Sequence, residues 1–325
     1  MSGIGEFGRI RRYFAPLAAG FPGALNLTDD AALIDLPAGE RLVVTTDAMV
    51  AGVHFIGDEP PESLGRKALR VNLSDLAAMG ATPVAYSLAL ILPKTIDDQW
   101  VAGFAAGLAA DQREFEIALS GGDSVTTAGP ITISITAFGR VGDGWLSRSG
   151  AKAGDNVYVS GTIGDAALGL DLLQGRLELP PDFAATLVDR YRLPRPRLAL
   201  GRALVGIASA ALDVSDGLMA DLAHLAEGAH LAGRIDAAAI PLSIGARAAL
   251  ANNPEGCLSR VLAGGDDYEL LFTASPINHY KVMELAASLG LAVTLIGSMK
   301  VGEGVSALAA NGTAVTPTVL GYKHG

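Results

Sequence analysis

Hydrophobic and polar positions follow two periods along the first half of the chain. The stretch GPITISITAFGRV at 129–141 alternates with period two, as a half-buried strand does, whereas PVAYSLALILP at 83–93 is apolar at almost every position, as a buried strand is. Apolar residues at helical spacing predict a helix over 60–80, which begins at two prolines and ends at a glycine. The same spacing predicts a helix over 97–115, which begins with acidic residues that can cap it. The pattern predicts strands that alternate with helices.

Two more strands of this half carry Asp near their ends. We expect ERLVVTTDAMV, at 40–50, to be a strand that ends at Thr45–Asp47. We expect IALSGGDSV, at 117–125, to be a strand that runs into a glycine-rich turn. Both predictions place a carboxylate where a strand gives way to a loop.

A polar, glycine-rich patch at 142–155 separates this half from the next, and we place the domain boundary in it. The predicted domains are 1–148 and 149–325. Beyond the patch we expect strands at 156–162, 268–274 and 292–299, helices at 164–175, 194–206 and 278–290, and a strand, turn and helix at 207–230. Because strands and helices interleave in both halves, the fold class is α/β or mixed α+β.

Composition narrows the class of protein. At 325 residues two domains are expected, and no apolar run approaches the roughly 18 residues that span a bilayer. Cys257 is the only cysteine and no secretory signal is apparent, so we expect a cytoplasmic protein. The formal net charge of -10 argues against a nucleic-acid partner. An acidic protein can still bind an anion through a metal ion or a local Arg.

Asp residues recur in turns beside Gly, Ser or Thr, as in TDDAA, VVTTDAMV, LSGGDSV, LDVSDGL and LAGGDDYELLF. Helix capping explains any one of them taken alone. The series as a whole suits Mg²⁺, which prefers hard oxygen ligands, and the sequence has no cysteine pair or HExxH that would favour zinc. No P-loop, protein-kinase or GxSxG motif is present. A bound nucleotide would therefore be held by acidic loops and bridging metal ions.

The motifs occur in an order that resembles the thiamine-monophosphate kinase family, within the superfamily named for aminoimidazole-ribonucleotide synthetase. The pieces that carry the resemblance are TDDAA, TTDAMVAGVHF, VNLSDLAAMGATP, LSGGDSV, SRSGAKAGD, LDVSDGL, GGDDYELLF and the terminal GYKHG. The resemblance implies a two-domain PurM-like fold, with an N-terminal mixed sheet that forms a barrel with its twin in a homodimer and a C-terminal α/β domain. It also implies that ATP phosphorylates thiamine monophosphate directly, with several Mg²⁺ ions and no phospho-enzyme.

The resemblance assigns roles to individual residues. It implies Mg²⁺ ligands at Asp30, Thr45, Thr46, Asp47, Asp75, Asp123, Asp213 and Asp216. It implies ATP contacts at Gly121, Gly122, Arg148 and Ser215, and substrate contacts at His54, Asp266 and Tyr322. No side chain is expected to act as nucleophile or general base, because the acceptor phosphate is already anionic at neutral pH.

Several alternatives stay open at this point. His54 could be a polar residue at a strand end, Arg148 a linker charge and Tyr322 a packing residue, while Asp267 and Glu269 are expected to cap or to form ion pairs. Another ATP-dependent enzyme of the superfamily is one rival function, such as a purine synthetase or a hydrogenase-maturation protein. A sensor that binds Mg²⁺ and nucleotide without turnover is the other.

Overall fold

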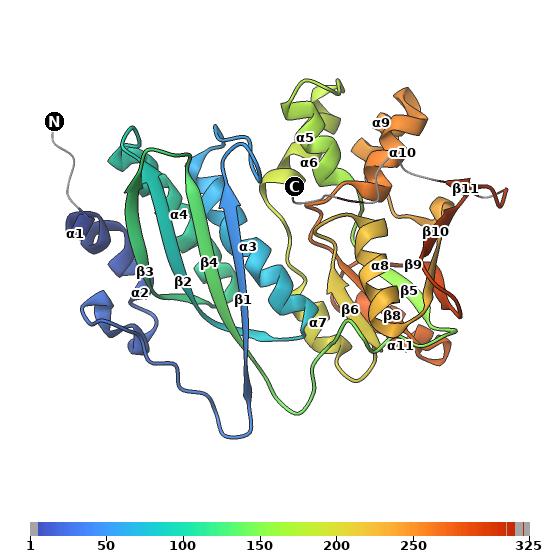
Figure 1. Ribbon diagram of the computed structural model, residues 1–325, viewed down its shortest axis with the longest axis horizontal. Coiled ribbons are helices and arrows are strands. Elements are labelled where there is room, and N and C mark those ends of the chain that lie inside the picture. The colour runs from blue at the N-terminus through green and yellow to red at the C-terminus, as the bar shows by residue number, and fades with distance from the viewer. Residues whose placement is uncertain (1–5, 310, 316–320, 322–325) are drawn as a thin grey trace. The chain divides into compact units, whose positions relative to one another are not determined.

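The computed structural model describes residues 6–309, 311–315 and 321. The chain divides into two compact units, one formed by 1–76 and 81–143 and the other by 77–80 and 144–325 (Figure 1). Among the described residues, every helix is too short or too polar to traverse a lipid bilayer. Each unit is built around its own sheet.

The first unit contains a four-stranded mixed sheet in the order β1-β4-β2-β3. Its strands are β1 (Arg41–Val50), β2 (Thr82–Pro93), β3 (Ala118–Thr127) and β4 (Thr132–Val141). Strand β4 is antiparallel to both of its neighbours, and β2 and β3 run parallel. The two edges of the sheet are therefore β1 and β3, which matters for the acidic residues that they carry.

Helices α3 (Pro61–Ala78) and α4 (Asp98–Phe115) lie against one face of this sheet (Figure 1). The alternation predicted for 129–141 is confirmed in β4, where Ile133 and Ile135 are buried and the residues between them are partly exposed. The acidic cap expected before α4 is confirmed, because Asp97 accepts a hydrogen bond from the backbone of Trp100 at 2.8 Å. Shorter helical segments precede β1: α1 (Glu6–Arg9), η1 (Ile10–Phe14), α2 (Ala15–Ala18) and η2 (Pro22–Leu27).

Two expectations for this sheet are wrong. Strand β1 does not end at Thr45–Asp47 but continues to Val50, because its residues keep pairing with β4 as far as Val50 and Thr132. The glycines at 121–122 form no turn, since β3 continues through them to Thr127. Gly122 adopts φ +155° with the position of a Cβ only 1.9 Å from the carbonyl oxygen of Leu88. The glycine thus allows β3 to stay close to β2 after the register shift between them.

The second unit contains a seven-stranded mixed sheet in the order β11-β10-β7-β9-β5-β8-β6. The strands are β5 (Asn156–Ser160), β6 (Ala210–Asp213), β7 (Ala232–Asp236), β8 (Leu270–Ala274), β9 (Val293–Lys300), β10 (Val305–Leu308) and β11 (Ala314–Val315). The helices are α5 (Asp165–Leu173), α6 (Pro181–Arg192), α7 (Leu198–Leu204), α8 (Leu218–Ala229), α9 (Ile244–Asn252), α10 (Pro254–Ala263) and α11 (His279–Ser288), with short turns η3 (Ala237–Ala239) and η4 (Pro276–Asn278).

An apolar cluster lies at the core of the second unit. It joins Val157 and Val159 of β5, Leu212 of β6 and Leu222 and Leu225 of α8, all of them fully or nearly fully buried. The strand, turn and helix predicted at 207–230 are confirmed as β6, a turn and α8. The buried face of α8 anchors that turn, which follows Asp213 and contains Asp216, two of the predicted metal ligands.

Candidate functional site

In the first unit, an acidic pair forms where β1 faces α3. The Thr45 hydroxyl donates a 2.5 Å hydrogen bond to Asp75 Oδ2, and the backbone N–H of Asp47 donates to Asn72 Oδ1 at 3.2 Å. Asn72 and Asp75 are three residues apart on α3, so both side chains face the strand. Thr45 and Asp47 are two apart on β1 and share a side of it. The fold thus brings three of the predicted metal ligands, Thr45, Asp47 and Asp75, to one place.

The electrostatics of this pair favour a cation. Burial, and then the negative charge of Asp75, raise the pKa of Asp47 from its ordinary value of 3.8 to about 7. The fold therefore holds Asp47 where its ionised form is disfavoured unless positive charge is added. Two carboxylates beside a hydroxyl form a set of hard oxygen donors that suits Mg²⁺.

Three other residues of the first unit with predicted metal or substrate contacts lie in or near β1. Thr46 shares a 2.9 Å hydrogen bond with the hydroxyl of Thr136 on β4, on the opposite side of β1 from Thr45. His54 accepts a hydrogen bond from the backbone of Val50 at Nδ1, at 3.1 Å, which assigns the ring proton to Nε2 when the imidazole is neutral. Asp30 is exposed in the segment before β1.

Asp123 and the two glycines before it lie on the other edge of the sheet. Asp47 pairs with Ile135, Ile135 pairs with Leu88, and Leu88 pairs with Gly122, the neighbour of Asp123. Three strand spacings separate the two edges, which is about 14 Å measured along the sheet. Within one copy of the chain the sheet therefore does not bring Asp47 and Asp123 to one ion.

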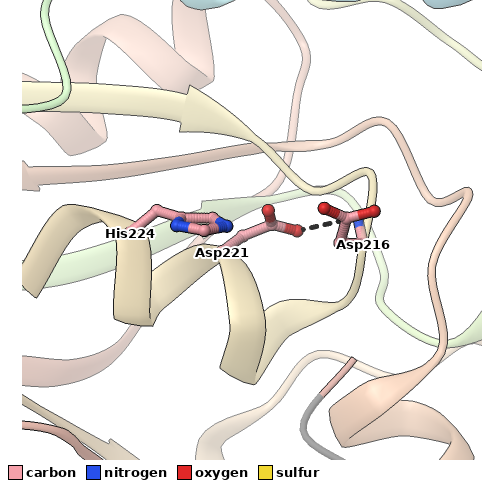
Figure 2. Close-up of side chains that lie close together, drawn as sticks. All are labelled: Asp216, Asp221 and His224. Carbon is pink, nitrogen blue, oxygen red and sulfur yellow. Dashed lines mark hydrogen bonds between the residues drawn. The ribbon is translucent and has the colours of Figure 1, made fainter. Parts of the chain in front are cut away.

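In the second unit, the turn between β6 and α8 gathers acidic groups (Figure 2). Asp213 ends β6 and is 2% exposed, and Asp216 follows in the turn. Asp221 reaches back from the first turn of α8, so its Oδ2 accepts from the backbone N–H groups of Asp216 at 3.1 Å and Gly217 at 3.0 Å. His224 lies one turn further along α8, and ligand atoms of Asp216, Asp221 and His224 all lie within 4.8 Å of one another.

This is the one group of three or more potential His, Cys, Asp or Glu ligands in the part of the chain that the structure describes. Burial, and then the charge of Asp216, raise the pKa of Asp221 to about 7, while Arg148 lowers it slightly. Arg148 itself is exposed. The resemblance implies a metal role for Asp216 and assigns no role to Asp221 or His224. Their spacing of three on a predicted helix that follows the acidic turn was the available signal.

The GGDDYE loop packs directly against this turn. The backbone N–H of Asp266 donates to the carbonyl of Ser215 at 2.9 Å, and that of Tyr268 donates to the carbonyl of Val214 at 2.8 Å. A Cβ on Gly265 would lie 2.2 Å from the carbonyl oxygen of Ser215, so only glycine fits there. The predicted nucleotide contact Ser215 and the predicted substrate contact Asp266 are therefore neighbours.

Asp267 and Glu269 have the scaffold roles expected of them. Asp267 accepts from the backbone N–H groups of Gly164 at 2.6 Å and Ala166 at 3.1 Å, at the start of α5. Its burial raises its pKa to about 8. Glu269 is fully buried and forms ion pairs with Arg190 at 2.7 Å and Arg197 at 2.5 Å. The prediction of a cap and an ion pair is confirmed. Tyr322, the remaining predicted substrate contact, lies outside the described residues.

The chain has two compact units, each with its own mixed sheet, and it is related to AIR synthase. A family model described as AIR synthase related protein, N-terminal domain, matches residues 28–141. A thiamine-monophosphate kinase from Caulobacter vibrioides is 45% identical over 323 residues, which cover 98% of this chain and 91% of that protein. The chain belongs to the thiamine-monophosphate kinase family, and the resemblance inferred from the motifs is confirmed.

Solved structures agree with this assignment. The crystal structure of thiamine-monophosphate kinase from Stenotrophomonas maltophilia K279a matches with a TM-score of 0.84 and 40% identity, covering 93% of this chain and 98% of that one. A structure of AaThiL complexed with AMPPCP and TMP matches with a TM-score of 0.78 and 32% identity, covering 98% of this chain and 97% of that one. The two-sheet mixed α/β fold expected for the superfamily is confirmed.

Proposed function

We propose that the chain transfers the terminal phosphoryl group of ATP directly to thiamine monophosphate, giving ADP and thiamine diphosphate. Family membership supports this reaction, and the AaThiL relative that was solved with AMPPCP and TMP supports the pair of reactants. The observation that carries the proposal for this chain is the Asp47–Asp75 pair, where burial and the neighbouring carboxylate disfavour ionised Asp47 until a divalent ion adds positive charge. That ion would link an acidic protein to two anionic reactants.

Mg²⁺ is the metal that fits these donors, since carboxylate and hydroxyl oxygens dominate. The residues that we propose to hold several ions are Asp30, Thr45, Thr46, Asp47, Asp75, Asp123, Asp213 and Asp216. When bound, Mg²⁺ supplies charge neutralisation at the phosphates. The chain's own contribution is positional: the Thr45 hydroxyl orients Asp75, and Asn72 fixes the backbone at Asp47. No side chain is proposed as a nucleophile.

The remaining proposed roles are contacts to ATP and to thiamine monophosphate. Gly121, Gly122, Arg148 and Ser215 are proposed to contact ATP, and His54, Asp266 and Tyr322 to contact thiamine monophosphate. The exposed glycine backbone of β3 allows close approach of phosphate, and an exposed Arg can fork two phosphate oxygens. Nδ1 of His54 accepts from the backbone of Val50, which fixes the orientation of the ring.

We also propose a homodimer in which the uncovered face of the four-stranded sheet closes into a barrel with a second copy. That face exposes Val44 at 54% and Leu42 at 43%, and helices cover the other face. A second copy would also supply an Asp123 from its β3 edge, which one copy alone keeps away from Asp47. Residues 1–148 are proposed as the domain for ATP, Mg²⁺ and dimerisation, and 149–325 as the α/β domain. The free, buried Cys257 suits a reducing cytoplasm.

The first experiment measures ADP and thiamine diphosphate from purified chain, ATP, thiamine monophosphate and Mg²⁺. We expect product with wild type and with Asp58→Asn, an exposed control, and none with Asp47→Asn or Asp123→Asn, all with unchanged circular dichroism. Absence of product from wild type across a range of Mg²⁺ would reject the reaction. Tight ATP binding without turnover would favour the sensor instead.

Mixing the two inactive variants tests the shared site. If Asp47 of one copy works with Asp123 of the other, a mixed dimer has one intact site and one doubly altered site. With half of the dimers mixed, activity returns to about a quarter of wild type. No recovery after verified subunit exchange would place both carboxylates of each site in the same copy.

A further inference from the structure

The loop at 264–268 presents two side chains on the side away from the core of its unit. Asp267 and Glu269 are 2% and 0% exposed, whereas Asp266 and Tyr268, which alternate with them, are only partly buried. Asp266 has φ +71° and Tyr268 φ +50°, so two residues other than glycine occupy the left-handed region within three positions. Such conformations cost free energy and persist only where the surroundings impose them.

The surroundings here do impose them. Asp267 is anchored to the backbone at the start of α5, and Glu269 to Arg190 and Arg197. On the other side, the backbone of the loop is hydrogen-bonded to Val214 and Ser215 of the neighbouring turn. The directions of Asp266 and Tyr268 are thus set by the scaffold before any ligand arrives.

The two side chains meet. The Tyr268 hydroxyl donates a long hydrogen bond of 3.4 Å to Asp266 Oδ1. A carboxylate next to an aromatic ring suits a cationic ring, because the carboxylate attracts the positive charge and the aromatic face adds a cation–π contact. An anionic ligand would be repelled by the carboxylate, and a neutral ring would gain no charge attraction from either group.

We infer that Tyr268 is a substrate-contacting residue that works with Asp266 to select the positively charged thiazolium ring of the acceptor. This inference rests on the proposed function, which supplies a thiazolium substrate. The loop lies against the turn that carries Ser215 and Asp216, so a ring held here would lie beside that turn. Tyr268 thereby determines the class of acceptor, a phosphate ester attached to a cationic heteroaromatic ring.

The test compares Tyr268→Leu, which removes the aromatic face, with Tyr268→Phe, which keeps the face and removes the hydroxyl. Tyr280→Leu is the matched control, because Tyr280 is 86% exposed at the start of α11. Each protein is assayed with thiamine monophosphate and with its reduced, uncharged tetrahydro derivative. Calorimetry with thiamine itself, which has the cation and no phosphate, measures the ring contact without turnover.

We expect Tyr268→Leu to raise KM for thiamine monophosphate and the Kd for thiamine about tenfold, a loss between that of an exposed and that of a desolvated cation–π contact, because Tyr268 is partly buried. KM for ATP and KM for the uncharged derivative stay within about twofold, and Tyr268→Phe stays within about threefold of wild type throughout. Tyr280→Leu changes none of these values. If Tyr268→Leu does not unfold cooperatively on heating, Tyr268→Met takes its place and has the same expected result.

An unchanged KM for thiamine monophosphate in the Leu or Met variant overturns the inference, as does an equal loss for the charged and uncharged acceptors. Either result leaves the proposed function intact, because wild type still turns over. A wild type that makes no thiamine diphosphate rejects the proposed function instead, and thiamine binding that depends on Tyr268 would still support the cationic-ring contact.

Discussion

Asp47→Asn should abolish activity and yet stabilise the metal-free protein, by an amount that grows with pH. The substitution keeps the shape of the side chain and the backbone hydrogen bond from Asp47 to Asn72. It removes a carboxyl group whose pKa is raised to about 7 by burial and by Asp75. The penalty for ionising that group in the folded chain disappears with it.

The direction in which stability changes with pH follows from proton binding to Asp47. Between pH 4 and 7 the folded state holds a proton on Asp47 that the unfolded state has lost, so the stability of the metal-free wild type falls as pH rises through this range. One pKa unit corresponds to about 1.4 kcal/mol. From pH 5 to the folded pKa of about 7, the stability of Asp47→Asn relative to wild type should therefore rise by about 3 kcal/mol, and it should stay constant above that.

The assay is urea unfolding followed by circular dichroism at pH 5 and pH 8, with EDTA present. Wild type, Asp47→Asn and the exposed control Asp58→Asn are compared. Asp221 and Asp267 also have raised pKa values, but they are common to all three proteins and cancel in the differences. Parallel stability curves for wild type and Asp47→Asn across this range would refute the argument that the fold holds Asp47 against its own ionisation.

Three further substitutions test other parts of the structure. Glu269→Gln removes the buried counter-charge of Arg197 and the nearer of the two carboxylates that pair with Arg190, so urea unfolding should show a loss of about 3–5 kcal/mol, and a loss below about 1 kcal/mol would contradict that role. Gly122→Ala places a methyl group against the Leu88 carbonyl, so the ATP Kd measured by calorimetry should rise at least about tenfold; Gly142→Ala, with open space around it, is the control. Val44→Glu puts a charge on the uncovered sheet face, and sedimentation should show monomers where wild type sediments as a dimer.

The periodicity of the sequence was a good guide to the elements with strong patterns. The alternation at 129–141, the capped helix α4 and the β6–turn–α8 unit all form as predicted, because local pattern and tertiary environment agree there. The ends of β1 and β3 were misjudged for one reason. Polar residues and glycines on an edge strand resemble a loop, and only pairing with β4 and β2 keeps them extended.

The candidate site was predictable in its residue types and only partly in its arrangement. Short motifs identified Asp47 and Asp75, but nothing local to either motif shows that a strand and a helix bring them together. Asp123 is an equally clear motif residue that the strand order carries to the opposite edge. Tyr268 was overlooked because its contact with Asp266 depends on two left-handed backbone conformations that no hydrophobic pattern encodes.

The two adjacent aspartates of the GGDDYE loop face different environments, and this should separate them in any saturation mutagenesis survey. Substitutions of the inward-facing Asp267 should deplete the protein from cells through misfolding and degradation. Substitutions of its partly exposed neighbour Asp266 should leave abundance near normal while growth that depends on thiamine diphosphate made by this chain suffers. A survey that scores abundance and growth separately would then distinguish a scaffold position from a ligand position one peptide bond apart.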